Sequence, residues 1–394
     1  MREVLIDITR LVHRFVNKRL ATGVDRVSLA YIHHYGVNAR AVYRHKDGKF
    51  VFRRAESKVL FSWLLGLGKN GSPKATIYKG LLTGCLVQNV AGKFLFTTAH
   101  TGQESDNYVQ MLADQKVRPI FMVHDLIPLT HPQFCRAGED AKHLQRLHNC
   151  VRSAAGVICN SEATLAGLMR FCLEQDWKVP PTKVALLATE LPVVTSGAPF
   201  LSHPYFVFVS TIEPRKNHLM LLHLWEKLVL RLGPQTPKLV LIGQRGWHYD
   251  AVINLLETSQ LLKGVVLEVS SCSDIEMVNY LQHSRAMLFP SFTEGFGMPV
   301  AEALTLGVPV IASDLPVFKE FSGDVPDYID VLDEAAWSAM ICDYAEPESV
   351  TRAQQLTRLK GFKAPTWKQH FVEVDKLLDQ LDERSIGATE RSPL

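Results

Sequence analysis

The stretch that decides the fold is Tyr205–Gly233, which reads YFVFVSTIEPRKNHLMLLHLWEKLVLRLG. Its first part, Tyr205–Ser210, is a short apolar run of β-branched and aromatic residues, the pattern of a buried strand. Asn217 is a suitable N-cap, and the leucine-rich run after it has the length and periodicity of a helix. The stretch therefore predicts a strand, a loop and a helix, the repeating unit of a parallel sheet with crossover helices.

The same alternation continues through the rest of the chain. In the second half we expect strands at Lys238–Ile242, Val265–Val269, Ala286–Phe289 and Val308–Ala312. We expect helices there near Tyr249–Thr258, over Asp274–His283 and after Pro299. In the first half we expect strands at Glu3–Asp7, Pro119–Val123, Gly156–Cys159 and Val184–Leu187, and a helix near Asp25–Tyr35. Both halves are expected to be α/β, with ligands at the carboxyl ends of the strands.

A chain of 394 residues is too long for one ordinary core, so we expect two domains. The segment Pro192–Pro204 has several prolines and no helical period, as in an interdomain linker. We place an N-terminal Rossmann-like domain at residues 1–198 and a C-terminal one at residues 199–370. The last helix, around Trp367–Leu381, is amphipathic, and we expect the helix and tail at residues 371–394 to pack on the first domain.

The net charge of +3 hides an uneven distribution of charge. Residues 1–100 contain 17 Lys or Arg and 5 Asp or Glu, a balance of +12, so the remaining residues carry −9. The basic part is either solvated surface or a region that attracts anionic lipid head groups or a phosphate-bearing acceptor. We expect no nucleic-acid partner, because no nucleic-acid motif accompanies the charge.

The composition, with 47% hydrophobic and 21% charged residues, is that of a globular protein. No run reaches the roughly 18 apolar residues of a membrane span, and the N-terminus lacks a signal-peptide pattern. We therefore expect a cytoplasmic protein, with the inner face of the plasma membrane as a candidate peripheral docking surface. The seven cysteines form no CxxC pair, so we expect neither a zinc site nor a disulfide framework.

The strongest functional signal is PSFTEGFGMPVAE at Pro290–Glu302, directly after an expected strand. Its two glycines permit close approach of the backbone to a ligand, and Pro299 suits the first turn of a helix. The free N–H groups at such a helix start bind phosphate oxygens or sugar hydroxyls. We expect Glu302 in the first helical turn and Glu294 before the loop, so that both accept from hydroxyl groups on opposite sides of a ligand.

This segment is similar to the E-x7-E signature of the retaining GT-B glycosyltransferases of the family 4 type. The resemblance implies that Glu294 sits near the donor sugar as a catalytic residue and that Glu302 binds the ribose of the nucleotide. It implies that four residues between them meet the donor sugar and phosphates: Gly295, Phe296, Gly297 and Met298. The implied fold is GT-B, two Rossmann-like domains whose parallel sheets face each other across a cleft, with a C-terminal helix that crosses back to the first domain.

The loop TIEPRKN at Thr211–Asn217 lies between the strand and the helix quoted first. Two adjacent cations at a helix start neutralise a diphosphate. The family has a similar loop, and the resemblance implies that Arg215 and Lys216 hold the diphosphate and act in catalysis. Where the family often has glycine this chain has Ser210, so the closeness of the backbone approach there stays open.

In the first half, FMVHDLIPLTHP at Phe121–Pro132 places His124 and Asp125 just outside an expected strand. The family has a similar histidine that faces the donor sugar. The resemblance implies that His124 contacts this sugar and supports the transition state, whereas Asp125 orients the loop on the acceptor side. The alternative for His124 is a purely structural histidine.

Three weaker segments are also similar to the family. The loop TGVDR, which begins at Thr22, resembles the acceptor or donor-phosphate loop of the first domain. Thr22 and Arg26 would then lie on the acceptor side and Gly23 would approach the donor; the alternative is a simple helix entry. Gly243, after an expected strand, is a candidate for approaching the nucleotide, and Ser270–Asp274 lies where the family reads the base.

One motif is rejected. GLGKNG at Gly66–Gly71 matches the dinucleotide-binding pattern GxGxxG, but it does not follow the first strand and no acidic residue stands about 20 positions later. A dehydrogenase is therefore not expected. The apolar stretch Val59–Leu67 before it is either a core or interdomain helix or a contact with a membrane or lipid acceptor.

The expected reaction is transfer of a hexosyl group, with GDP-mannose as first choice of donor, to a polysaccharide or lipid-linked oligosaccharide with retention of configuration. The EPRKN and HDLIP variants resemble bacterial O-antigen, capsule and exopolysaccharide transferases of the mannosyl or rhamnosyl type. No DxD-type carboxylate pair is evident near the loops, so we expect no metal and no cofactor besides the nucleotide-sugar substrate. The alternatives are a non-catalytic nucleotide-sugar-binding partner subunit and a GT-B-type epimerase or phosphorylase.

Overall fold

The computed structural model describes residues 2–17, 21–45, 48–67, 75–79, 89–192 and 197–389. The Gly66–Gly71 motif and the expected linker therefore lie partly outside the described residues. The chain forms two compact units, of which the first comprises residues 1–129, 140–187 and 367–394 and the second residues 130–139 and 188–366. The division falls between Leu187 and Ala188, before the expected linker, and a short segment of the first half groups with the second unit.

The first unit is built on a seven-stranded sheet in the order β3-β2-β1-β4-β5-β6-β7. The strands are β1 (Val4–Asp7), β2 (Ala39–His45), β3 (Gly48–Val51), β4 (Phe94–Thr97), β5 (Arg118–Val123), β6 (Gly156–Cys159) and β7 (Thr182–Val184). All neighbouring strands are parallel except β3, which runs antiparallel to β2. The strand order reverses between β1 and β4, and the loops that leave strands at such a reversal diverge to admit a ligand.

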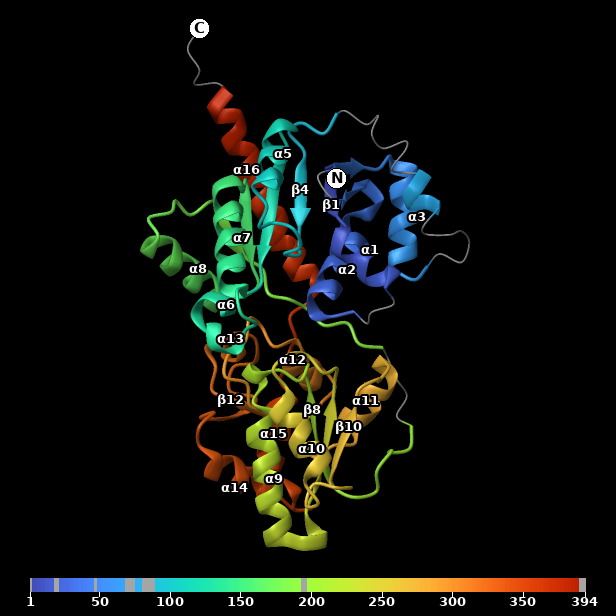
Figure 1. The fold of residues 1–394 in the computed structure, drawn as a ribbon, viewed down its shortest axis with the longest axis vertical. Helices are drawn as coiled ribbons and strands as arrows, with labels where there is room; N and C mark the ends of the chain where they lie inside the picture. The colour runs from blue at the N-terminus through green and yellow to red at the C-terminus, as the bar shows by residue number, and fades with distance from the viewer. Residues whose placement is uncertain are drawn as a thin grey trace. The chain divides into compact units, whose positions relative to one another are not determined.

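Helices connect these strands, and the last helix of the chain returns to them. The helices are α1 (Thr9–Val16), α2 (Gly23–Tyr35), α3 (Arg54–Leu64), α5 (Asp106–Asp114), α6 (Ile127–Thr130), α7 (Glu139–Ser153), α8 (Glu162–Glu174) and α16 (Trp367–Thr389). The red α16 lies among the blue and green elements of the first unit in Figure 1 and contacts β6 and β7. A Cβ at Gly156 would lie 3.0 Å from Leu381 and 3.2 Å from Leu377, so the helix packs closely on this strand. The crossing back of the C-terminal helix is therefore confirmed.

The second unit is built on a six-stranded sheet in the order β10-β9-β8-β11-β12-β13. The strands are β8 (Tyr205–Val209), β9 (Lys238–Ile242), β10 (Val266–Val269), β11 (Met287–Phe289), β12 (Val310–Ser313) and β13 (Asp327–Ile329), and all are parallel. The order is that of the Rossmann fold, with its reversal between β8 and β11. Each unit is thus one Rossmann-like α/β domain, and the predicted fold class is confirmed.

The helices of the second unit follow the strands one by one. They are α9 (His218–Leu232), α10 (Asp250–Thr258), α11 (Asp274–Gln282), α12 (Met298–Thr305), α13 (Pro316–Ser322), α14 (Glu334–Ala345) and α15 (Val350–Leu359). Large side chains from strands and helices fill the core between them, among them Phe206, Phe208, Trp225, Phe289 and Phe318, all fully buried. Burial of each such ring stabilises the unit by about 1.5–3 kcal/mol.

Two sets of strands differ from expectation. The strand expected at Val184–Leu187 was wrong, because β7 covers Thr182–Val184; beyond it the Leu186 carbonyl accepts from His370. The sequence did not predict β2, β3, β4 and β13. In β2 the reason is plain: arginines interrupt the apolar pattern, and they are tolerated because Arg44 pairs with Asp7 at 2.8 Å.

The stretch Val59–Leu67 belongs mainly to α3, which packs Leu60, Phe61 and Leu64 into the first unit. Of its two alternatives, the core helix is therefore the one observed. Among the residues that the structure describes, no helix is both long and apolar enough to span a bilayer.

Candidate active site

The reversal of strand order in the second sheet brings two quoted motifs together. The loop after β8 is Thr211–Asn217 and the loop after β11 is Pro290–Gly297. Since β8 and β11 are neighbours, both loops leave the carboxyl edge side by side. The backbone N–H of Phe292 donates to the carbonyl of Arg215 at 2.8 Å and ties one loop to the other. This edge is where Rossmann-like sheets bind their ligands.

Arg215 and Lys216 form ion pairs with Glu294 at this edge. Nη1 of Arg215 donates to Oε2 of Glu294 at 2.7 Å and to the carbonyl of Thr293 at 3.1 Å. Nζ of Lys216 donates to Oε1 of Glu294 and lies 4.8 Å from the centroid of the Phe289 ring. The side chains of Lys216 and Glu294 are 8% and 6% exposed. The cation pair singled out in the sequence thus meets the first glutamate of the E-x7-E segment directly.

Glu213 completes this group of charges, and the sequence analysis missed it. Its Oε1 lies 2.6 Å from Nε of Arg215, and its side chain is 3% exposed. The signal was present, because Glu213 stands two residues before Arg215 in the quoted loop. An acidic residue in a loop usually points to solvent, however, so only its burial reveals the role. With Glu213 and Glu294 opposite Arg215 and Lys216, the group is balanced in charge.

The pKa values of Glu294 and Lys216 show the effect of these neighbouring charges. Burial works to raise the pKa of Glu294, but Arg215 and Lys216 outweigh it, and the pKa falls to about 2. Burial lowers the pKa of Lys216, with Arg215 adding to this change and Glu294 opposing it. Glu294 is therefore a carboxylate at neutral pH. It can accept hydrogen bonds and orient the two cations, but it has no proton to donate.

The start of α12 has the geometry of a helix that binds anions. Gly297 precedes it with φ of +97°, and a Cβ there would lie 2.5 Å from the ring of Phe318, so only glycine fits. Pro299 lies in the first turn, as predicted. The N–H groups of Gly297 and Met298 donate to no other described residue. Such unsatisfied groups at a helix N-terminus are suited to phosphate oxygens.

The other residues of the segment divide between surface and core. Phe296 is buried and stacks on Phe321 with 4.9 Å between ring centroids, so only its backbone is placed to meet a ligand. Gly295 and Met298 are half-buried. Glu302 is buried and lies in the second turn of α12, because the helix begins at Met298; its expected place in the first turn was wrong. Its ribose contact stays a prediction.

In the first unit, His124 directly follows β5 and is buried. Its Nε2 lies 2.8 Å from the carbonyl oxygen of Thr98. Because a carbonyl only accepts, Nε2 carries the proton, and Nδ1 of the neutral ring is an acceptor. Burial lowers the pKa of His124 and Arg10 adds to this change, while the Thr98 carbonyl and Asp125 oppose it. The ring is thus set to accept a hydrogen bond at Nδ1.

Two further histidines follow His124 in a row of ring contacts, and the sequence did not indicate them. The ring of His100 lies 5.4 Å from that of His124 and 5.7 Å from that of His143, centroid to centroid. Burial, with His124 and His143 next in importance, holds the pKa of His100 well below its ordinary value. Three neighbouring imidazoles are spared mutual repulsion only while they stay neutral, which favours the neutral form of His124.

The TGVDR loop forms a helix entry. Thr22 is the N-cap of α2, and Asp25 accepts from the N–H of Thr22 at 2.8 Å in a capping box. Gly23 is the first residue of the helix and Arg26 is half-buried on it. The alternative of a simple helix entry is thus the local structure, and the acceptor-side roles of Thr22, Gly23 and Arg26 stay predictions. Asp125 accepts from the N–H of Ile127 at 3.0 Å and so orders the start of α6.

Comparison with known proteins finds one family model in the second unit. Residues 196–325 match the model of the family described as glycosyl transferases group 1. The chain is similar to that family over this segment. It contains the cation loop and the whole E-x7-E segment.

Two curated relatives of the chain are named as mannosyltransferases. The chain is 27% identical over 297 residues to the serotype-specific mannosyltransferase WbdA of Escherichia coli, covering 69% of this chain and 35% of WbdA. It is 26% identical over 272 residues to O-antigen chain mannosyltransferase B of Escherichia coli, covering 66% of this chain and 71% of that protein. The chain therefore spans only about a third of WbdA but most of the shorter relative.

Solved structures with the same architecture agree on the fold. Anabaena Alr3699/HepE in complex with UDP-glucose has a TM-score of 0.66 at 14% identity, covering 98% of this chain and 99% of that one. Sucrose-phosphate synthase of Thermosynechococcus elongatus has a TM-score of 0.65 at 14% identity, covering 98% and 100%. At such identity the likeness shows the GT-B fold and nothing about the substrate.

Two other predicted residues of the second unit have structural roles, and the approach of Gly243 to the nucleotide stays a prediction. Gly243 has φ of +152°, and a Cβ on it would lie 2.0 Å from the carbonyl oxygen of Ser210, so glycine is required for the packing of β8 against β9. The Oγ of Ser210 lies 3.2 Å from Nε2 of His218. Asn217 is the N-cap of α9, as predicted, with φ of 61° and no side-chain capping hydrogen bond.

The loop expected to read the base is also a helix entry of the second unit. Within Ser270–Asp274, Ser273 is the N-cap of α11 and forms a capping box with Glu276. Its contact with a base stays a prediction. No group of three or more His, Cys, Asp or Glu side chains in the described part of the chain is placed to hold a metal ion.

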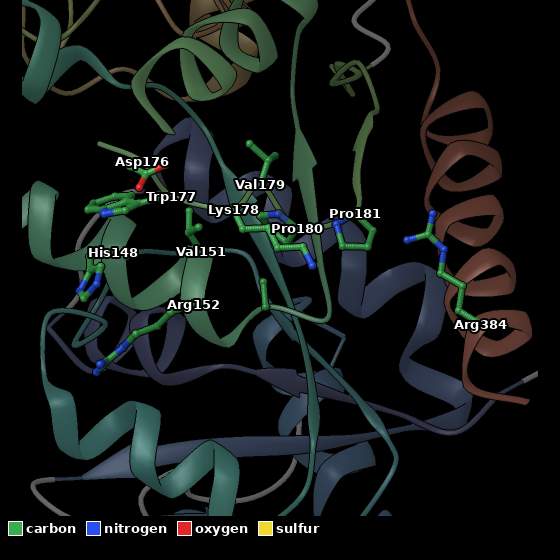
Figure 2. A pocket seen from close by; sticks show the side chains of 11 residues that line it. His148, Val151, Arg152, Asp176, Trp177, Lys178, Val179, Pro180, Pro181 and Arg384 are labelled. Carbon is green, nitrogen blue, oxygen red and sulfur yellow. The ribbon is translucent and has the colours of Figure 1, made fainter. Parts of the chain in front are cut away.

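A pocket of about 760 Å³ lies in the first unit, away from His124. It is lined by the end of α7, the loop before β7 and Arg384 of α16, and Figure 2 shows Arg152, Lys178 and Trp177 around it. The segments before β6 and β7 place it at the amino edge of the first sheet, opposite to the edge that carries His124. Because α/β sheets bind their ligands at the carboxyl edge, this pocket is not the reaction site.

Proposed function

We propose that the protein transfers a mannosyl group from GDP-mannose to a growing polysaccharide or lipid-linked oligosaccharide, with retention of configuration. The observation that carries this proposal is the group of Arg215, Lys216, Glu213 and Glu294 beside the start of α12. The O-antigen mannosyltransferases among the relatives support the choice of sugar.

The cations supply the electrostatics of the reaction. As the bond between the sugar and the diphosphate breaks, negative charge builds on the leaving oxygens. Arg215 and Lys216 are already held in place by carboxylates, so they need little reorganisation to meet that charge. The N–H groups that open α12 add a second, uncharged set of donors for the phosphates. We propose that these groups neutralise the diphosphate without a bound metal.

The remaining roles follow the resemblance. Glu294, ionised and turned toward the cations, would lie near the donor sugar, and Glu302 would accept from the ribose hydroxyls. His124 would contact the sugar through Nδ1, accepting from a hydroxyl group while Nε2–H stays on the Thr98 carbonyl. Its neutral form at neutral pH is what this contact requires.

A donor screen tests the proposal. We expect GDP and GDP-mannose to bind more tightly than UDP-glucose or dTDP-rhamnose. Because a ligand that binds the folded state stabilises it, GDP and GDP-mannose should raise the melting temperature of the protein more. With a mannose-terminated lipid acceptor, GDP release should accompany a product that keeps the anomeric configuration of the donor, measured by NMR. Binding without any transfer would instead favour a non-catalytic nucleotide-sugar-binding subunit, and a product of inverted configuration would exclude retention.

A further inference from the structure

The segment Thr130–Glu139 groups with the second unit, although its neighbours in the chain belong to the first. Its short 3₁₀ turn, Pro132–Phe134, ends on an aromatic ring. The ring of Phe134 stacks on that of Phe292, with 5.0 Å between the centroids and 17° between the planes. The ring of His131 lies nearly parallel to that of Phe134 as well, at 6.1 Å and 11°. Phe134 is thus the ring shared by two stacked contacts.

The backbone of Phe134 is held by a second loop. Trp247, in the loop after β9, donates from Nε1 to the Phe134 carbonyl at 3.1 Å. The guanidinium carbon of Arg136 lies 5.3 Å from the centroid of the Trp247 ring. The loop after β9 is joined in turn to the cation loop, because the N–H of Gly246 donates to the Ile212 carbonyl at 3.0 Å. Phe134 therefore contacts two of the loops at the carboxyl edge of the second sheet.

The loop that carries Phe292 also carries the first glutamate of the E-x7-E segment. Glu294 stands two residues after Phe292, and its carboxylate meets Arg215 and Lys216. The ring of Phe292 is half-buried, and within the described ranges no other aromatic ring contacts it. A movement of Phe292 would displace the Glu294 carboxylate from the two cations. Catalytic groups have to be held to within about 0.5 Å, so even a small displacement slows the reaction.

We propose that Phe134 is a positioning residue, which stacks on Phe292 and so holds the loop after β11 where Glu294 meets Arg215 and Lys216. This inference rests on the proposed function, because it takes that charged group to stabilise the leaving diphosphate. Phe134 acts through Phe292 and needs no contact with the substrate. The alternative is that the ring only stabilises the folded unit, and the experiment has to separate the two.

Hydrogen–deuterium exchange of the free, full-length protein tests the contact without a substrate. The N–H of Phe292 donates to the Arg215 carbonyl, so its exchange reports opening of the loop. We expect Phe134→Ala to speed exchange in peptides that contain Phe292 about fivefold, the factor that corresponds to an aromatic pair of ordinary strength. Phe134→Tyr keeps the ring and should exchange like wild type.

Phe200→Ala is the matched control for the exchange experiment. The ring of Phe200 lies in the segment before β8 and contacts that of Tyr280 at 4.8 Å, so the variant removes a similar ring contact from the same unit. Exchange in the Phe292 peptides should stay at the wild-type rate in this variant. If Phe134→Ala does not fold, Phe134→Leu keeps an apolar side chain at this position but lacks the ring.

Turnover shows whether the contact serves the reaction. We expect Phe134→Ala to lower kcat about tenfold at a temperature well below its melting point, less than the loss expected on removing the charge of Glu294. Affinity for GDP should stay within a few-fold of wild type, and Phe134→Tyr should restore kcat. Phe292→Ala should have the same effect, and the double variant should lose no more than either single one, because both remove one contact.

The proposal is overturned if Phe134→Ala leaves exchange in the Phe292 peptides unchanged. It is also overturned if the loop opens faster while kcat stays at the wild-type value, or if the losses in kcat of Phe134→Ala and Phe292→Ala multiply in the double variant. Failure of the proposed function has a different signature. Wild type would then release no GDP from GDP-mannose, while the exchange comparison would still decide whether Phe134 holds the loop.

Discussion

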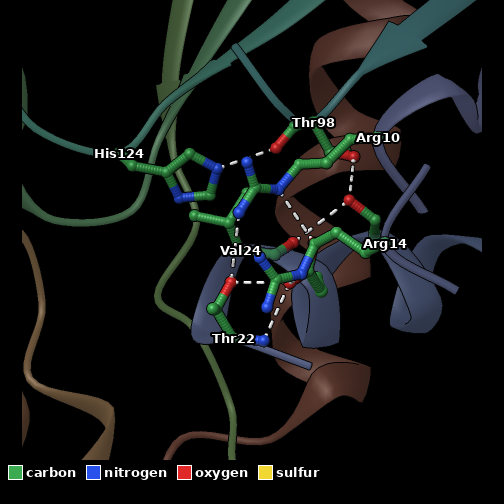
Figure 3. Close-up of polar contacts among 8 residues, drawn as sticks. Arg10, Arg14, Thr22, Val24, Thr98 and His124 are labelled. Carbon is green, nitrogen blue, oxygen red and sulfur yellow. Dashed lines mark hydrogen bonds and ion pairs between the residues drawn. The ribbon is translucent and has the colours of Figure 1, made fainter. Parts of the chain in front are cut away.

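The two units carry charged groups at the same topological position, but these groups join different elements. In the second unit, Arg215 and Lys216 face Glu213 and Glu294, and the group joins the loops after β8 and β11. In the first unit, Arg10 and Arg14 of α1, labelled in Figure 3, share Asp25 of α2. A group that joins two loops at the carboxyl edge is placed to meet a ligand and is held in one geometry, as a catalytic group must be. A group that joins two helices fixes the fold, so we expect it to act on stability.

The largest effect is expected at the charged group of the second unit. Lys216→Ala should lower kcat by about 10²–10³, because one preorganised donor to the developing charge is lost and Glu294 is left with a single cation. Lys227→Ala is the matched control, since Lys227 is an exposed lysine that pairs with Glu334, and it should transfer at the wild-type rate. Steady-state GDP release measures both. Unchanged turnover in Lys216→Ala would mean that the group is purely structural.

Substitution of Glu294, in the same charged group, should have the next largest effect. Glu294→Gln keeps the shape but removes the charge that positions Arg215 and Lys216, so we expect kcat to fall about 100-fold. Binding of GDP alone should stay within a few-fold of wild type, because the cations that hold the phosphates remain. Calorimetry with GDP and a turnover assay separate the two. A loss of GDP affinity that matches the loss of turnover would assign Glu294 to binding instead.

At the Asp25 group of the first unit the expected effect is on stability. Asp25→Asn removes the carboxylate that anchors Arg10 and Arg14, and we expect a loss of about 2 kcal/mol in the free energy of unfolding, less than for a fully buried pair because both arginines are partly exposed. Asp106→Asn, whose partner Arg152 is exposed, should cost less than about 0.5 kcal/mol. Urea denaturation compares the two, and equal losses would contradict the distinction.

Acid should destabilise both units through buried neutral histidines. Burial lowers the pKa of His370 in the first unit to about 4 and that of His218 in the second to about 3. The unfolded chain takes up these protons near pH 6.5. The stability that each neutral ring contributes is therefore present above about pH 6.5 and is lost as the pH falls toward 4 or 3.

At pH 5.5 each of these histidines should cost about 1 kcal/mol relative to pH 7.5. Melting temperatures across this range measure the slope, and His370→Gln should make it shallower. His223→Gln, at the surface, should keep the wild-type slope. A slope that His370→Gln leaves unchanged would show that other groups dominate acid unfolding.

The smallest effect is expected from metal removal. Since Arg215 and Lys216 are assigned to the diphosphate, EDTA should leave the rate of transfer unchanged to within experimental error. If the rate falls in EDTA and returns with added Mg²⁺ or Mn²⁺, a metal ion stabilises part of the charge on the diphosphate. The role given to Arg215 and Lys216 would then be smaller than proposed.

Much of the second unit could be predicted from the sequence, and less of the first. The strands at Lys238–Ile242 and Gly156–Cys159 lie where the apolar runs predicted them. By contrast β2 escaped prediction, because Arg40 and Arg44 break its pattern and become acceptable only when Glu3 and Asp7 lie opposite. Local periodicity reports burial well when the strand is wholly apolar and fails when ion pairs between distant residues allow charges in it.

The candidate site divides in the same way. Arg215, Lys216, Glu294 and His124 could be singled out, because each lies in a loop directly after an apolar strand. Glu213, Arg10 and Arg14 could not, because a charged residue in such a loop or helix usually lies on the surface. What distinguishes them is contact with a buried partner, and no spacing in the sequence encodes that contact.

By itself the sequence determined the alternation of strands and helices, the loops that end at the carboxyl edges, and the adjacent cations in one of those loops. These features depend on residues within a few turns of one another. Only the tertiary structure decided that β8 lies beside β11 and β1 beside β4, that Glu294 meets Lys216, and that Asp25 is shared by two arginines. Those contacts join segments far apart in the chain, and their energies depend on burial and charge compensation that only the folded units create.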